Sequence, residues 1–143
     1  MLISGALDTT ARVWDVEKST EIKTLTGFHG SVMKAAWSPD GKYVVTVSAE
    51  PTDNLRIWDA TTWTVIRRWT QKESLIDFAW APDSTRFALD MANDPWDEPH
   101  YSWIKLYTAG SWVETTVVTS TWGIDHIAGT RTVSDWRSPK TGK

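Results

Sequence analysis

The segment Val13-Trp14-Asp15 returns 44 residues later as Ile57-Trp58-Asp59, and this recurrence is the strongest signal in the sequence. An independent marker, Trp37-Ser38-Pro39-Asp40-Gly41, returns 43 residues later as Trp80-Ala81-Pro82-Asp83-Ser84. The segment Leu106-Tyr107-Thr108 follows at a similar distance and is interpreted as a third, degraded copy. Because separate markers share one period of about 44 residues, the sequence predicts an array of similar structural units.

Each repeat is predicted to consist of four β-strands, named a to d in chain order. Residues 55–58 alternate apolar and polar side chains, and residues 43–47 are rich in β-branched ones. Strand a ends at the Pro-Asp-Gly turn of residues 39–41, where proline and glycine favour a tight reversal. No stretch carries the periodicity of an amphipathic helix. The expected strands are 32–37, 43–47, 55–58 and 63–69 in one repeat, and 75–80, 86–91, 103–107 and 112–118 in the next.

These motifs resemble the WD-repeat family of β-propellers, and the resemblance covers residues 2–118. It implies an all-β fold of four-stranded antiparallel blades arranged around a channel, with about three blades in this chain. One domain is expected at 1–129, followed by a basic C-terminal tail at 130–143. The expected parts of the domain are blade 1 (strands b to d, 2–26), blade 2 (32–70), blade 3 (75–118) and a closing strand a at 124–128.

The chain contains 11 Trp in 143 residues, an excess that the resemblance explains structurally. Facing sheets lie about 10 Å apart and need bulky side chains between them. Trp14, Trp37, Trp58 and Trp80 are therefore expected between blades. The resemblance also implies a buried hydrogen-bonded set of His, Ser, Asp and Trp in each blade, with Thr46 replacing Ser in the second. The structural candidates are Ser4, Asp8 and Trp14 in the first blade and His29 and Trp58 in the second.

Recognition is expected in the loops, because propeller strands form the scaffold. The resemblance implies that the b–c and d–a loops share the face around the channel mouth. Blade 2 adds residues 50–53 there, and blade 3 expands to residues 90–102, which carry four acids and two aromatic anchors. The candidate partner-binding residues are Glu50, Asp53, Asp94, Trp96, Asp97, Glu98, His100 and Tyr101. The alternative is a solvated loop in which Trp96 packs back against its own blade.

Composition and motifs exclude several function classes. The absence of Cys excludes thiolate catalysis and cysteine zinc sites, and the formal charge of −3 argues against nucleic acid. No window is apolar enough to span a membrane, and no secretory signal opens the chain, so we expect a cytoplasmic protein. Asp94, Asp97, Glu98 and His100 fit no metal-loop spacing, and no nucleophile–base motif occurs. We therefore expect no metal, no cofactor and no catalytic residue.

The predicted function is a non-catalytic scaffold that binds a protein or peptide through the b–c loop face and favours a basic partner. The alternative is an enzyme or a small-ligand propeller with its site at the channel mouth. A closed propeller needs at least four blades, about 170 residues. With 143 residues, the chain is expected to form a homodimer of six blades, in which strand 124–128 of one copy pairs with the N-terminal strands of the other. The alternative is that the chain is a fragment of a longer propeller.

Overall fold

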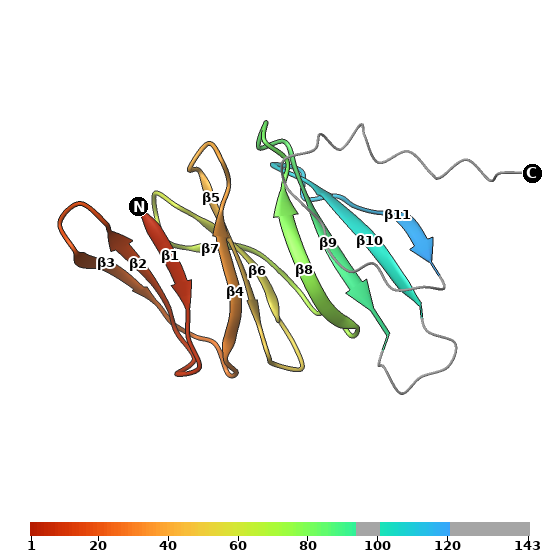
Figure 1. The fold of residues 1–143 in the computed structure, drawn as a ribbon, viewed down its shortest axis with the longest axis horizontal. Coiled ribbons are helices and arrows are strands. Elements are labelled where there is room, and N and C mark those ends of the chain that lie inside the picture. Colours follow the sequence, from red (N-terminus) through yellow and green to blue (C-terminus); the bar gives the residue numbers. More distant parts are fainter. Residues whose placement is uncertain (94–100, 121–143) are drawn as a thin grey trace, which may run out of the picture. The chain divides into compact units, whose positions relative to one another are not determined.

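The computed structural model describes residues 1–93 and 101–120, and the described residues form eleven β-strands (Figure 1). No helix that is long and apolar enough to cross a membrane occurs in them. The chain divides into two compact units, Met1–Lys72 and Glu73–Lys143. The strands are β1 (Leu2–Gly5), β2 (Ala11–Asp15), β3 (Thr20–Leu25), β4 (Val32–Trp37), β5 (Tyr43–Ser48), β6 (Leu55–Asp59), β7 (Val65–Trp69), β8 (Ser74–Trp80), β9 (Arg86–Ala92), β10 (Ser102–Thr108) and β11 (Glu114–Ser120).

The strands form three antiparallel sheets in which spatial order follows chain order. Unit 1 contains sheet A (β1-β2-β3) and sheet B (β4-β5-β6-β7), and unit 2 contains sheet C (β8-β9-β10-β11). The all-β fold class with four-stranded antiparallel sheets is thereby confirmed. The last strand of sheets B and C begins later than predicted, at Val65 and Glu114. The reason is that Trp63 and Trp112, placed in strands by their alternation, adopt positive φ within turns.

The core of unit 1 lies between sheets A and B. Sheet A contributes Ile3, Ala11, Val13 and Leu25, and they pack in one cluster with Phe28, Val32, Val44 and Trp58. The backbones of β1 and β4 approach closely, because a β-carbon at Gly5 would collide with the carbonyl oxygen of Val32. The Val32 amide also donates a hydrogen bond to the carbonyl of Ala6 over 3.0 Å. Burial of these aliphatic and aromatic side chains stabilises the contact between the two sheets.

Sheet C has a core built on stacked rings. The rings of Phe87 and Tyr107 stack with centroids 4.8 Å apart, and Trp80 packs on Phe87 at 5.2 Å. Tyr107 pairs with Phe87 in the register that Trp58 has with Val44 in sheet B. The Tyr107 hydroxyl donates to Glu114 over 2.6 Å. The degraded third copy thus keeps a large aromatic residue at the position of Trp58.

The turn between the last two strands of each sheet contains a non-glycine residue in the left-handed region. These residues are Ser19 (φ 52°), Trp63 (φ 57°) and Trp112 (φ 56°). A non-glycine residue in this region costs about 1–2 kcal/mol. Trp63 offsets that cost by packing edge-on against Trp37 at 5.7 Å, and Trp112 is buried. Ser19 is exposed, so its backbone strain has no such compensation.

We therefore expect Ser19→Gly to stabilise unit 1 by about 1 kcal/mol, because glycine adopts positive φ without steric cost. Urea unfolding followed by circular dichroism measures the change. Glu17→Gly is the matched control, since this exposed residue of the same turn has an ordinary φ and the substitution should destabilise. If Ser19→Gly and Glu17→Gly destabilised the protein equally, the inference that the Ser19 backbone is strained would be wrong.

Candidate functional site

The two loops at one end of the sheet B strands, residues 26–31 and 49–54, are joined by the buried carboxylate of Glu50. The Glu50 side chain is only 2% exposed. One carboxylate oxygen accepts hydrogen bonds from Arg56 Nη2 at 2.8 Å and from Ser48 Oγ at 2.5 Å. The other oxygen accepts the backbone N–H of His29 at 2.9 Å. A single carboxylate therefore holds the β3–β4 loop against the β5–β6 loop.

The Arg56 side chain, 3% exposed, completes this frame from strand β6. Its Nη1 donates to the carbonyl of Gly27 over 2.9 Å, and its Nε donates to the carbonyl of Asp53 over 3.1 Å. The guanidinium carbon lies 4.4 Å from the centroid of the Phe28 ring, a cation–π geometry. The buried cation thus has three hydrogen-bond partners and one aromatic ring beside it, and these groups come from both loops.

Electrostatics keep Glu50 ionised. Burial by itself raises the pKa of a carboxyl group. At Glu50 the hydrogen bonds from Ser48 Oγ and the His29 N–H, together with the charge of Arg56, outweigh burial and hold the pKa below its ordinary value. We name this group of residues, Glu50, Arg56, Ser48, Phe28 and the His29 backbone, the Glu50 frame.

Sheet A contains a corresponding pair of an acid and an arginine, Asp8 and Arg12, but this pair is exposed to solvent. Asp8 accepts a hydrogen bond from Arg12, and it also accepts the backbone N–H and hydroxyl of Thr10 at 3.2 and 2.7 Å. The hydrogen bonds from Thr10, together with the bond and charge of Arg12, lower the pKa of Asp8. The side chains of Arg12 and Asp8 are 30% and 50% exposed. Solvent therefore screens this pair, whereas it does not reach Glu50 and Arg56.

A hydroxyl–indole hydrogen bond occurs in both of the first two repeats. The indole N–H of Trp14 donates to Ser4 Oγ over 3.0 Å, and that of Trp58 donates to Thr46 Oγ1 over 2.9 Å. Threonine at position 46 thus supplies the same acceptor as the serine at position 4. In each sheet the bond links two adjacent strands across the face that carries the arginine.

The His29 ring, expected in the buried hydrogen-bonded set of its blade, does not lie in the core. The ring is 87% exposed, and its Nδ1 lies 3.3 Å from a Glu50 oxygen. Phe28 occupies the buried position instead, with its ring 5.7 Å from that of Trp58. Of two adjacent aromatic side chains, the apolar one gains more by burial, so the imidazole turns to solvent. His29 contributes to the frame through its backbone.

Glu50, predicted as a partner-binding residue, has an enclosed carboxylate that is bonded within the chain. Asp53 is half-exposed and lies 3.6 Å from Arg68, so it remains a candidate for contact with a partner. Sequence reasoning missed Arg56. The signal was present, because Arg12 and Arg56 both stand two residues before the repeated tryptophan, each with an acid upstream.

The inserted loop of the third repeat is shorter than expected. Asp90 lies within β9 and is buried, and Ser102 already pairs with Ala92 in the sheet. The loop is closed at its base, where the Tyr101 N–H donates to Asn93 Oδ1 over 2.7 Å and the Asn93 N–H donates to the Tyr101 carbonyl over 3.1 Å. The Tyr101 side chain is 44% exposed. The predicted residues Asp94, Trp96, Asp97, Glu98 and His100 lie outside the described residues.

Within residues 1–93 and 101–120, no group of three or more His, Asp or Glu side chains is arranged to hold a metal ion. The predicted closing strand 124–128 and the basic tail 130–143 also lie outside the described residues. The domain limits 1–129 and 130–143 accordingly stay a prediction.

The sheets with sequential antiparallel strands are of the kind that form β-propeller blades. A solved structure, the β-propeller domain of Myceliophteria thermophila Cps50 (Swd1), superposes on 80% of this chain with a TM-score of 0.62 at 20% identity. This match shows the fold, and it covers 32% of that protein chain. Residues 19–59 match the family described as WD domain, G-beta repeat. Residues 19–59 thus carry a WD repeat, and the chain as a whole has a fold similar to that of a β-propeller domain.

Curated relatives share single repeats with this chain. The chain is 51% identical to the mouse F-box-like/WD repeat-containing protein TBL1X over 43 residues, which are 30% of this chain and 8% of the relative. It is 49% identical to Ribosome assembly protein 4 of Chaetomium thermophilum over 43 residues, again 30% of this chain and 8% of the relative. It is 37% identical to rat Coronin-7 over 59 residues, 41% of this chain and 6% of that protein. The matched stretch thus spans less than a tenth of each relative.

We expect Thr46→Val to destabilise unit 1 by about 2 kcal/mol, because it leaves the buried indole N–H of Trp58 without an acceptor. Ser4→Ala removes the corresponding acceptor of Trp14 in the open sheet, where water can replace it, and should cost less than about 1 kcal/mol. Chemical denaturation of both variants measures the difference. Equal losses of stability in the two variants would contradict the expectation that the buried hydrogen bond of Thr46 contributes more than the exposed one of Ser4.

Glu50→Gln should cost about 3 kcal/mol at neutral pH, because it leaves the buried guanidinium of Arg56 without a counter-charge. The lowered pKa of Glu50 means that this stability is present above the ordinary glutamate pKa, about 4.3, and is lost as the pH falls through the folded-state value. Denaturation of wild type and variant at a series of pH values should show curves that converge in acid. Asp53→Asn, on an exposed pair, is the control and should change stability by less than about 1 kcal/mol.

Proposed function

We propose that this chain is a non-catalytic scaffold that binds a protein or peptide through the loops that the Glu50 frame holds in place. The observation that carries the proposal is the enclosure of Glu50 and Arg56, which join the β3–β4 and β5–β6 loops. Loops held in one conformation lose little entropy when a partner binds, so a rigid frame beneath exposed loops favours recognition. The exposed ring of His29 and the half-exposed Asp53 are the side chains that this frame presents.

The names of the relatives support a protein partner. One is named for ribosome assembly, and another contains an F-box-like region beside its WD repeats. WD-repeat proteins are generally scaffolds without catalytic activity, and we propose the same for this chain. The proposal includes no metal, no cofactor, no nucleic acid and no membrane among its ligands.

We further propose that the partner is basic. Asp53 lies in the β5–β6 loop, and the sequence of the β9–β10 loop adds Asp94, Asp97 and Glu98 without a Lys or Arg. Opposite charge steers association and discriminates against acidic partners. Tyr101, partly exposed at the base of this second loop, is the residue type that anchors interfaces.

A fluorescein-labelled poly-lysine peptide and a poly-glutamate peptide of the same length provide the test by fluorescence anisotropy. The poly-lysine peptide should bind, and Tyr101→Ala and Asp53→Lys should each weaken it about tenfold, which is about 1.4 kcal/mol. Glu17→Lys is the control, because it makes the same charge change in the exposed β2–β3 turn at the opposite strand ends. Equal binding of the two peptides, or equal weakening by Glu17→Lys and Asp53→Lys, would reject the basic preference.

Self-association into a homodimer of about six blades is a separate proposal. Its support is that sheet A has three strands whereas sheets B and C have four, with β1 at the edge of sheet A. A strand from a second copy can add to such an edge. The segment predicted to do so, 124–128, lies outside the described residues.

A further inference from the structure

Strand β7 is the last strand of sheet B, and one of its two edges pairs with β6. Within the part of the chain that the structure describes, no strand pairs with its other edge, which we call the β7 edge. An edge of this kind presents backbone N–H and C=O groups that can hydrogen-bond to another strand. The β7 edge is therefore a place where a segment of a second molecule can extend sheet B.

The strand that carries this edge is held in place from the other side. Arg67 to Trp69 pair in regular register with Leu55 to Ile57. Just beyond the strand, the Gln71 N–H donates to Asn54 Oδ1 over 2.8 Å, and Asn54 Nδ2 donates to the Gln71 carbonyl over 2.7 Å. Because the strand is already ordered, pairing with a further strand costs little additional entropy in this protein.

The charge of the β7 edge is unlike that of the rest of the chain. Residues 65–72 contain Arg67, Arg68 and Lys72 and no acidic residue, a local charge of +3 in a chain with a net charge of −3. By contrast, the last strand of sheet A, β3, carries one Glu and one Lys, and the last strand of sheet C, β11, carries one Glu and no base. The excess of positive charge is thus a property of the β7 edge in particular.

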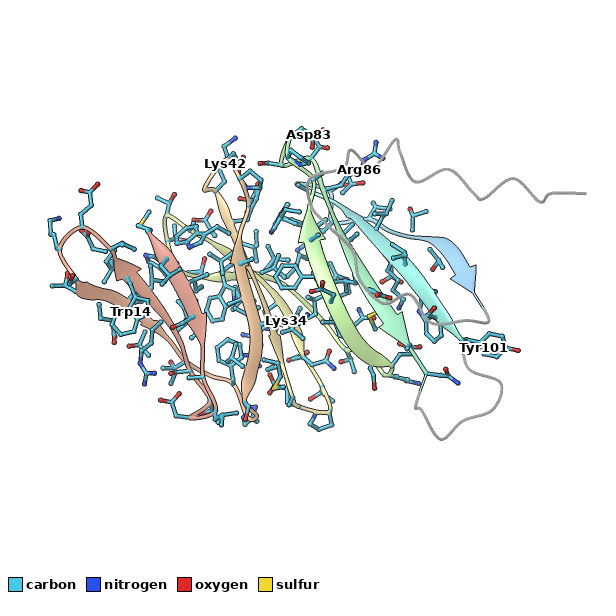
Figure 2. All side chains as sticks on the ribbon, in the orientation of Figure 1. Trp14, Lys34, Lys42, Asp83, Arg86 and Tyr101 are labelled. Atoms are coloured by element: carbon cyan, nitrogen blue, oxygen red, sulfur yellow. The ribbon has the colours of Figure 1, made fainter. Side chains whose placement is uncertain are left out.

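Two of the three cations at this edge are without an acid. Elsewhere a cation has one beside it: Lys42, labelled at the β4–β5 turn in Figure 2, lies 3.4 Å from Asp40. Arg67 and Lys72 are exposed, and neither forms an ion pair with an acid of residues 1–93 or 101–120. The Arg67 guanidinium instead donates to the carbonyl of the preceding residue, Ile66, over 3.1 Å. Both charges are available to a partner.

The third cation lies on the other side of the strand. Successive side chains of a strand point to opposite faces, so Arg67 and Arg68 place positive charge on both faces of the sheet beside the edge. Arg68 is 55% exposed and lies 3.6 Å from Asp53. A strand that meets both charges needs acidic residues at adjacent positions, because its own side chains alternate in the same way.

We propose that the β7 edge binds an extended acidic segment of a protein partner, which adds to sheet B as a fifth strand. Backbone hydrogen bonds to the edge supply affinity, and the side chains supply selectivity. Basic residues on an edge strand oppose pairing with apolar or basic strands, and the same residues favour an acidic one.

This inference does not rest on the proposed binding of a basic partner, because the β7 edge lies along a strand and the loops held by the Glu50 frame lie at strand ends. A chain with both surfaces brings a basic partner and an acidic partner together.

Fluorescence anisotropy with a fluorescein-labelled peptide, Thr-Val-Thr-Glu-Glu-Thr-Val-Thr, tests the proposal. The acidic peptide should bind, and the peptide with Lys in place of both Glu should not. Poly-glutamate should bind at least about tenfold more weakly than the acidic peptide, because glutamate is a poor strand former. N-methylation of the backbone amides of the acidic peptide should abolish binding, because it removes the donors that a strand offers to the edge.

Arg67→Glu and Lys72→Glu should each weaken the acidic peptide about tenfold, because each places a like charge beside its glutamates. Lys23→Glu is the matched control, since it reverses the charge of an exposed residue in β3, the last strand of sheet A, and should leave binding unchanged. Circular dichroism should show that all three variants remain folded.

Several outcomes would overturn the proposal. Equal binding of poly-glutamate or of the N-methylated peptide would show that charge alone acts, without strand pairing. Equal weakening by Lys23→Glu, or no weakening by Arg67→Glu and Lys72→Glu, would place the site elsewhere. A labelled single-stranded DNA that bound as tightly as the acidic peptide would reject a protein segment as the ligand. Arg67→Glu should not weaken poly-lysine binding, so failure of this proposal is distinguishable from failure of the basic preference.

Discussion

The burial of the Arg56 guanidinium is the constraint on which the ordered loops of unit 1 depend. A cation enclosed in a protein costs several kcal/mol unless a counter-charge and hydrogen-bond acceptors surround it. Glu50 supplies the charge, the carbonyls of Gly27 and Asp53 each accept a hydrogen bond from Arg56, and the Phe28 ring lies against the guanidinium. Because these groups come from two different loops, satisfying one side chain determines the path of both.

The same residues have different energetic roles in neighbouring repeats. Arg12 and Asp8 form the pair that Arg56 and Glu50 form, yet water screens the first pair and the covering sheet encloses the second. An exposed ion pair contributes little to stability, whereas breaking an enclosed one is costly. The neighbouring sheet, rather than the residue types, therefore decides which pair is structurally essential.

The tryptophan excess is largely architectural. Trp58 fills the space between two sheets, Trp37 and Trp63 pack on one another, and Trp112 is buried in a turn. Trp63 and Trp112 have positive φ, a backbone conformation that glycine would adopt without strain. Burial of a large ring offsets the local backbone cost, so strain at these turns reflects packing and carries no sign of a reactive site.

Sequence periodicity by itself indicated the strands, their sequential order and the WD-type repeat, because hairpin connections and period-two alternation are local properties of the chain; it misplaced the starts of β7 and β11. The repeat also marked Ser4 and Thr46 as counterparts, and in the structure each accepts the indole N–H of the tryptophan in its own sheet. The tertiary structure alone decided which side chains are enclosed. Phe28 and not His29 is buried, because the Phe28 ring packs against Trp58, which is distant in sequence. The Glu50 carboxylate is buried because it forms an ion pair with the buried guanidinium of Arg56. Alternation shows that a strand has two faces, but only the neighbouring sheet determines which face loses its water.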